Sequence, residues 1–177
     1  MIRRCHKTLI RNHKGFTLME LVVVVGLIVM MIGLTMPQIR SALSSDGLKR
    51  TALRMVGLAN NLRDEALREQ RTYGLHLDMA RQQYWVGFAT MTEEEQALAR
   101  ENARKLPHNV QILDVWFKEG GQVNEGETVI WFFKKGYVQP SAIHLGADDG
   151  RRFTIVLSPF GGKVKLLEKY VDLENTE

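Results

Sequence analysis

An uncharged apolar run is the dominant feature of the first forty residues. No charged residue occurs over residues 21–36, and the apolar stretch 16–36 is 21 residues long with Glu20 as its one charged interruption. A helix needs roughly 20 predominantly apolar residues to cross a bilayer. Five lysines and arginines, and no acids, precede the stretch, and such cations keep their end of a membrane helix in the cytoplasm. The pattern predicts a membrane-spanning helix over residues 16–36, with the C-terminal part of the chain translocated.

A second helical pattern begins at Pro37 and predicts an amphipathic continuation over residues 37–71. Apolar residues recur at alternating steps of four and three, which is the spacing of one helix face. This stripe consists of Leu48, Ala52, Met55, Ala59, Leu62 and Ala66. Pro37 lacks a backbone N–H and is expected to kink the helix, while residues 44–47 are a weak point at which it either breaks or bends. We expect the narrow stripe to lie on a β-sheet.

Residues 72–177 alternate apolar and polar positions in the way that β-strands do. Strands are predicted over residues 73–77, 84–88, 110–117, 128–133, 142–145, 151–157 and 163–167. The apolar positions change phase between Ile112 and Val115, which predicts a β-bulge, and the last strand has the one wet face of an edge strand. A capping box at Thr92 and Glu95 predicts a short helix that continues to Lys105. The predicted fold class is α+β, pilin-like, with a long N-terminal helix packed on a mostly antiparallel β-sheet domain.

The charge of the part beyond the apolar run is balanced. The chain carries 24 lysines and arginines against 20 acids, but five of these cations lie within residues 1–14. From Pro37 onward 19 cations face 19 acids, whereas a nucleic-acid-binding domain usually shows a basic excess. The only cysteine is Cys5, so a chain without residues 1–15 has no thiol for a disulfide or a metal. The balance argues against nucleic acid as a partner.

No pattern of residue types points to catalysis or to a bound cofactor. The sequence has no Gly-x-Ser-x-Gly motif. The histidines beyond residue 15 are His76, His108 and His144. They are scattered, without a second histidine or a cysteine at the spacing of a zinc site. Residues 148–150, Asp-Asp-Gly, are a candidate start of a calcium loop, but no acid follows at a suitable spacing and Asp-Gly is a common turn pair. The sequence predicts a protein that is no enzyme and binds no metal.

Residues 15–20 carry a specific motif, Gly-Phe-Thr-Leu-Met-Glu, between the short basic segment and the apolar run. The arrangement resembles the class III signal of type IV pilins and type II secretion pseudopilins. This resemblance implies that a prepilin peptidase cleaves after Gly15, which makes residues 1–15 a leader peptide, and that Phe16 is N-methylated. It also implies that Glu20 helps to dock the subunit through the N-terminus of a neighbouring subunit as a filament grows.

A second set of motifs lies in the C-terminal part of the chain, at residues 133–136, 149–155 and 157–164. These segments resemble the C-terminal domain of H-type minor pseudopilins and of FimT-type minor pilins. The resemblance implies a minor pseudopilin of a type II protein secretion system, a structural subunit at or near the tip of the periplasmic pseudopilus that helps to initiate assembly and protein export. It also implies a single-pass location in the inner membrane with residues 72–177 in the periplasm, followed by entry into the pseudopilus.

The partners implied by the resemblance are other minor and major pseudopilins, the prepilin peptidase, the inner-membrane assembly platform, and membrane lipid before assembly. Two other interpretations stay open at this level. One is a FimT-like minor pilin that captures DNA through Arg151 and Arg152, since phosphate contacts dominate such affinity; the acidic C-terminal residues 167–177 count against it. The other is a plain single-pass anchored protein that keeps residues 1–15.

Overall fold

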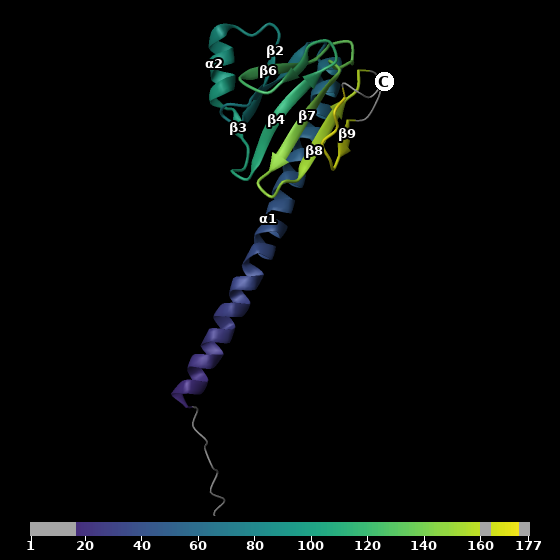
Figure 1. The fold of residues 1–177 in the computed structure, drawn as a ribbon. Coiled ribbons are helices and arrows are strands. Elements are labelled where there is room, and N and C mark those ends of the chain that lie inside the picture. The colour runs from purple at the N-terminus through teal and green to yellow at the C-terminus, as the bar shows by residue number, and fades with distance from the viewer. Residues whose placement is uncertain (1–16, 160–163, 174–177) are drawn as a thin grey trace, which may run out of the picture. The chain divides into compact units, whose positions relative to one another are not determined.

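The computed structural model describes residues 17–159 and 164–173, with the backbone but not the side chains of residues 32–46 (Figure 1). The chain divides into two compact units, Met1–Arg40 and Ser41–Glu177. Helix α1, Leu18–Arg68, contributes residues to both units. The other elements are β1 (Tyr73–Asp78), β2 (Gln83–Phe88), α2 (Glu93–Glu101), β3 (Arg104–Lys105), β4 (Val110–Phe117), β5 (Gly121–Val123), β6 (Glu127–Phe132), β7 (Ser141–Ala147), β8 (Arg152–Leu157) and β9 (Lys165–Leu167).

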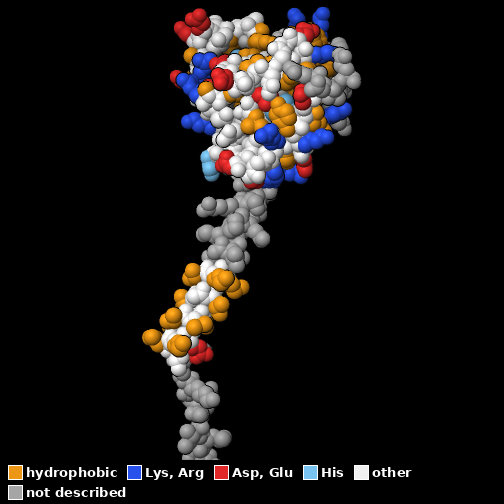
Figure 2. All heavy atoms as spheres, in the orientation of Figure 1, with side chains coloured by type: hydrophobic (Ala, Val, Ile, Leu, Met, Phe, Trp, Pro, Cys, Tyr) orange, Lys and Arg blue, Asp and Glu red, His pale blue; other side chains and the backbone are white. Residues whose placement is uncertain are grey.

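The described side chains of the first unit, residues 17–31, are all exposed. Most of them are large and apolar, and they line the helix in Figure 2. Among the residues that the structure describes, no helix reaches the length and hydropathy of a membrane span. Helix α1 continues through Pro37 and through residues 44–47, so the break that the sequence allowed at 44–47 does not occur.

The second unit is built on the stripe of α1 that the sequence predicts. All six of its residues, from Leu48 to Ala66, are at most 2% exposed. They belong to one apolar core together with inward-facing residues of two antiparallel sheets. Burying one leucine or methionine side chain in such a core contributes about 1.5–3 kcal/mol. The predicted α+β class is confirmed for this unit.

The first sheet has the strand order β3-β2-β1-β6, and all neighbours are antiparallel. Its central hairpin confirms the predicted one, with Leu75 and Leu77 fully buried in the core. The turn of the hairpin is tied to the other sheet by Gln82, whose amide oxygen accepts from the backbone N–H of Ile112 at 2.7 Å. The amide nitrogen of Gln82 donates to the carbonyl of the same residue at 3.2 Å. One side chain thus joins the two sheets through backbone groups.

The second sheet has the order β5-β4-β7-β8-β9, and α1 lies behind its central strands in the view of Figure 1. Strand β9 is at the edge, as predicted. The predicted bulge is also confirmed, because the pairing of β4 with β7 shifts between Ile112 and Asp114. The extra residue is Leu113, and its side chain lies on Gly146, where a Cβ atom would come within 2.9 Å of it. The bulge places Asp114 opposite His144, on the face of the sheet that points away from the core.

The segment after Thr92 differs from the prediction at its C-terminal end. The capping box of Thr92 and Glu95 is present, but the helix ends at Glu101 and not at Lys105. The side chain of Asn102 donates to the carbonyl of Leu98 at 2.9 Å and closes the last turn, after which β3 pairs with β2. The short strand β5, which follows β4, was missed by the sequence analysis.

Candidate functional site

Glu20 occupies the first turn of α1. Its backbone N–H donates to the Thr17 hydroxyl at 3.3 Å, so the threonine caps the helix. The Glu20 side chain is exposed, and residues 17–31 contain no cation that could pair with it. A carboxylate is favourable at a helix N-terminus but costly in an apolar environment unless it is paired. Gly15 and Phe16, the predicted cleavage and methylation sites, lie outside the described residues.

Arg151 and Arg152 line one pocket together with Lys49, Lys169 and Glu168, but the two guanidinium groups make different contacts. The Arg151 guanidinium donates to the Asp149 carboxylate from Nε at 3.0 Å and from Nη2 at 2.5 Å. Arg152 instead lies 5.7 Å from the centre of the Tyr170 ring. The hydrogen bond from Arg151 lowers the pKa of Asp149, so the carboxylate keeps its charge and offsets that of the arginine. This arrangement also uses the carboxylate that a calcium ion would need.

The Arg151–Asp149 contact leads to a prediction about acid titration. In an Arg151→Gln variant, the pKa of Asp149 is expected to rise toward its ordinary value of 3.8. A carboxyl group whose pKa is lowered in the folded state stabilises the fold at pH values above its ordinary pKa, and this contribution is lost as the pH falls. The variant should therefore be slightly less stable than the wild type at neutral pH. The expected loss in the free energy of unfolding is under about 1 kcal/mol, because the pair is partly exposed. An NMR titration of the Asp149 carboxyl measures the shift, with Arg152→Gln as the control. An unchanged pKa in Arg151→Gln would contradict the assignment.

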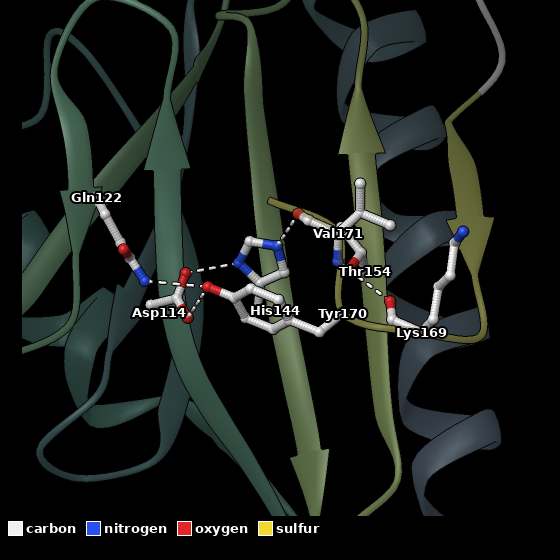
Figure 3. A network of polar contacts seen from close by, with 7 residues as sticks. All are labelled: Asp114, Gln122, His144, Thr154, Lys169, Tyr170 and Val171. Atoms are coloured by element: carbon white, nitrogen blue, oxygen red, sulfur yellow. Dashed lines mark hydrogen bonds and ion pairs between the residues drawn. The ribbon is translucent and has the colours of Figure 1, made fainter. Parts of the chain in front are cut away.

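The main polar network of the described chain holds the segment 168–173, which we call the C-terminal strap (Figure 3). It lies over the outer face of the second sheet. The Thr154 hydroxyl on β8 donates to the carbonyl of Lys169 at 2.7 Å and accepts from the backbone N–H of Val171 at 3.1 Å. Tyr170 stacks on the imidazole of His144, with ring centres 4.1 Å apart. The strap is therefore fixed through its backbone as well as through its aromatic ring.

A buried pair lies beneath the strap. His144 Nδ1 is 2.5 Å from Asp114 Oδ1, and the two side chains are 2% and 6% exposed. The other ring nitrogen, Nε2, is 3.0 Å from the carbonyl oxygen of Val171. The second oxygen of Asp114 accepts from the Tyr170 hydroxyl at 3.3 Å, which in turn accepts from Gln122 at 3.1 Å. These contacts bring together side chains from three strands and the strap.

The pKa of the Tyr170 phenol is consistent with its role as the hydrogen-bond donor to Asp114. Burial raises the pKa of the phenol, and the nearby Asp114 carboxylate and the hydrogen bond to it raise it further. The phenol therefore stays protonated at neutral pH and keeps its hydrogen bond to Asp114.

The His144–Asp114 pair resembles part of a hydrolase site in composition but not in arrangement. In a catalytic triad the nitrogen remote from the carboxylate faces a nucleophile, whereas Nε2 of His144 faces a backbone carbonyl oxygen. Within the described residues, no group of three or more His, Cys, Asp or Glu side chains is placed to hold a metal ion. The contacts of His144 and Asp114 hold the C-terminal strap in place. The sequence analysis missed it, because it placed His144 among scattered histidines and noted Tyr170 only as part of an acidic tail.

The chain is similar to several known proteins. It is 32% identical over 161 residues to the type II secretion system protein H of Pseudomonas aeruginosa, a match that covers 90% of this chain and 86% of the relative. A crystal structure of the minor pseudopilin EpsH from the type II secretion system of Vibrio cholerae superposes with a TM-score of 0.50 and 17% identity, over 72% of this chain and 97% of that one. A second EpsH structure superposes with a TM-score of 0.48 and 16% sequence identity, over 70% of this chain and 98% of that one.

No protein-family model matches the chain. The identity to the Pseudomonas protein extends over nearly the whole chain, and the EpsH superposition with a TM-score of 0.50 agrees with it in fold. On this evidence the chain belongs to the family of type II secretion system protein H, the H-type minor pseudopilins.

Proposed function

We propose that this minor pseudopilin is a structural subunit at or near the tip of a periplasmic pseudopilus, where it helps to initiate assembly and protein export. The observation that carries the proposal is the first unit, whose described side chains are exposed and almost entirely apolar. A helix that is apolar on all sides is stable only when lipid or other helices cover it. Membrane lipid before assembly, and the helices of other minor and major pseudopilins afterwards, would supply that cover.

Maturation of the subunit follows from the motif at residues 15–20. A prepilin peptidase removes residues 1–15 by cleaving after Gly15, and Phe16 becomes the N-methylated first residue. Residues 16–36 then span the inner membrane, with residues 37–71 continuing the helix and residues 72–177 forming the periplasmic domain. The inner-membrane assembly platform moves the subunit from this single-pass location into the pseudopilus.

Glu20 supplies the polar contact of assembly. After cleavage it is the fifth residue of the chain, and the stretch that follows offers no cation to its carboxylate. A positively charged N-terminus of a neighbouring subunit is a partner that an apolar filament core can provide. The cost of an unpaired carboxylate in an apolar environment makes this pairing selective for the correct axial position.

Deletion of the gene tests the proposal. Exoproteins are expected to accumulate in the periplasm and to be lost from the medium, while twitching motility and DNA uptake, scored in the same culture, stay intact. Normal secretion together with lost transformation would overturn the proposal in favour of the DNA-capturing minor pilin. The engagement of Arg151 with Asp149 weighs against that alternative.

Complementation of the deletion strain tests the role of Glu20. A Glu20→Gln variant is expected to restore export about tenfold less well than the wild type, because the loss of one charge pair in an apolar environment exceeds the roughly 1.4 kcal/mol that a factor of ten requires. The matched control is Glu94→Gln, which removes an exposed first-turn carboxylate from α2. Immunoblots establish that both variants are processed and present at equal levels. Full export by Glu20→Gln would refute the pairing.

A further inference from the structure

An open pocket of about 500 Å³ lies on the second unit, between helix α1, the start of β8 and the C-terminal strap. Its lining brings together four cations and one acid from three parts of the chain that are far apart in the sequence. These charged residues are Lys49, Arg151, Arg152, Lys169 and Glu168. The charge of the chain from Pro37 onward is balanced, so the pocket is a local excess of positive charge. Such an excess raises the local concentration of anions.

Only part of this charge is neutralised within the molecule. The Arg151 guanidinium donates to the Asp149 carboxylate. Lys49 pairs with Glu168 at 3.3 Å, but the two side chains are 58% and 62% exposed, and an ion pair so accessible to water contributes little to stability. With Asp149 included, four cations face two acids. The pocket therefore keeps an excess of about two positive charges for a ligand from outside.

The two remaining cations are positioned without an acid. The Arg152 guanidinium carbon lies 5.7 Å from the centre of the Tyr170 ring, and that ring is itself stacked on His144. A guanidinium above a ring face keeps the N–H groups of its edge for acceptors. Lys169 is fixed through its backbone carbonyl by Thr154, and Figure 3 shows its side chain turned away from the polar network. Within the described part of the chain, no acid pairs with Arg152 or Lys169.

We propose that this pocket binds a phosphate group, supplied either by a free phosphate ion or by the headgroup of a phospholipid. A phosphate monoester carries about 1.5–2 negative charges at pH 7, which matches the excess of the pocket, whereas a carboxylate carries one. Its oxygens accept two parallel hydrogen bonds from a guanidinium edge, and a lysine ammonium adds a point charge. The inference concerns the second unit alone and does not depend on the proposed position in the pseudopilus.

Titration of the full chain in uncharged dodecyl maltoside micelles tests the pocket. The backbone amide resonance of Gly150, which lines the pocket, is followed by NMR at constant ionic strength. Inorganic phosphate is added in one series and phosphatidic acid, incorporated into the micelles, in another. A saturable shift is expected. Saturation by phosphatidic acid alone identifies a lipid headgroup as the source, and saturation by inorganic phosphate identifies the free ion. A shift with neither ligand, or acetate binding as tightly as phosphate, would overturn the proposal.

Three variants separate the pocket from a general attraction to positive charge. In Arg152→Gln the dissociation constant is expected to rise at least about tenfold, because a charge-assisted hydrogen bond is lost. Lys169→Gln should also weaken binding and leaves the backbone contacts of the strap in place. The matched control is Arg71→Gln, which removes an arginine 4.5 Å from the centre of the Phe88 ring, outside the pocket, and should bind as the wild type does.

Two results with these variants contradict the proposal. Unchanged binding in Arg152→Gln would show that the pocket does not hold the ligand. Equal weakening in Arg152→Gln and Arg71→Gln would show that the phosphate responds only to the net charge of the domain. A single-stranded DNA oligonucleotide that binds far more tightly than either phosphate ligand would overturn the proposal in favour of a nucleic-acid surface.

Discussion

Replacing Leu62 by alanine is expected to lower the free energy of unfolding of the second unit by about 3 kcal/mol, within the range of about 2–5 kcal/mol for buried leucines. Leu62 is 2% exposed and lies in the middle of the α1 stripe, where it packs in the core between the helix and the sheets. The loss has two parts, the transfer free energy of the removed methyl and methylene groups and the cavity they leave. Alanines at neighbouring stripe positions cannot extend into that cavity.

The matched control for this prediction is Leu53→Ala. Leu53 lies in the same helix but is 52% exposed, so the same chemical change should cost less than about 1 kcal/mol. Urea unfolding of the full chain in micelles, followed by tryptophan fluorescence, measures both variants, since all three tryptophans belong to the second unit. Equal losses in the two variants would show that the stripe does not form the core.

Replacing His144 by alanine is expected to destabilise the same unit by about 3 kcal/mol, at the upper end of the cost of leaving a buried polar group without a hydrogen-bond partner. The change leaves the buried Asp114 side chain without its contact to His144 Nδ1, and a buried polar group that loses a hydrogen-bond partner is costly. It also removes the ring on which Tyr170 stacks. The strap should become accessible to proteases at the same time, because the Val171 carbonyl loses its donor.

The chain contains a second histidine–carboxylate pair that serves as the control. His76 Nδ1 is 3.2 Å from Glu127, but the two side chains are 18% and 32% exposed, and Glu127 also binds Arg100. In His76→Ala the carboxylate keeps a cation and contact with water, so the expected loss is about 1 kcal/mol, chiefly from the stacking of His76 on Trp85. The urea experiment compares the two variants directly, and a larger loss in His76→Ala would reverse the assignment of the stabilising pair.

The elements that follow from local patterns were predictable. The apolar residues of the α1 stripe recur with the period of a helix, and those of the β1–β2 hairpin alternate as in a strand. The change of phase after Ile112 indicates the bulge. The end of α2 was not predictable in this way, because the pairing of Arg104 and Lys105 with β2 competes with a helical extension that their own propensities favour. A tertiary contact decided that boundary.

The hydrogen-bond network under the strap could not be predicted from local sequence patterns. Asp114 and His144 are 30 residues apart, and Tyr170 is 56 residues from Asp114. Each residue alone fits an exposed or half-buried position, and only the pairing of β4 with β7 and the course of the strap bring them together. Glu20 could be selected as a candidate because its signal is the reverse, a single charge that stands out within an apolar stretch.

The bulge in β4 has a consequence for the divergence of related chains. Leu113 is the extra residue, because Asp114 pairs with His144 directly after Ile112 pairs with Leu145, and Val115 then returns to the core. Loss of the Leu113 codon alone would restore strict alternation and leave Asp114 opposite His144. The inserted residue and the acid after it can therefore be gained or lost separately, whereas Asp114 and His144 should change together as one inherited character. Gly146 should instead vary with Leu113, since it is the residue on which the Leu113 side chain rests.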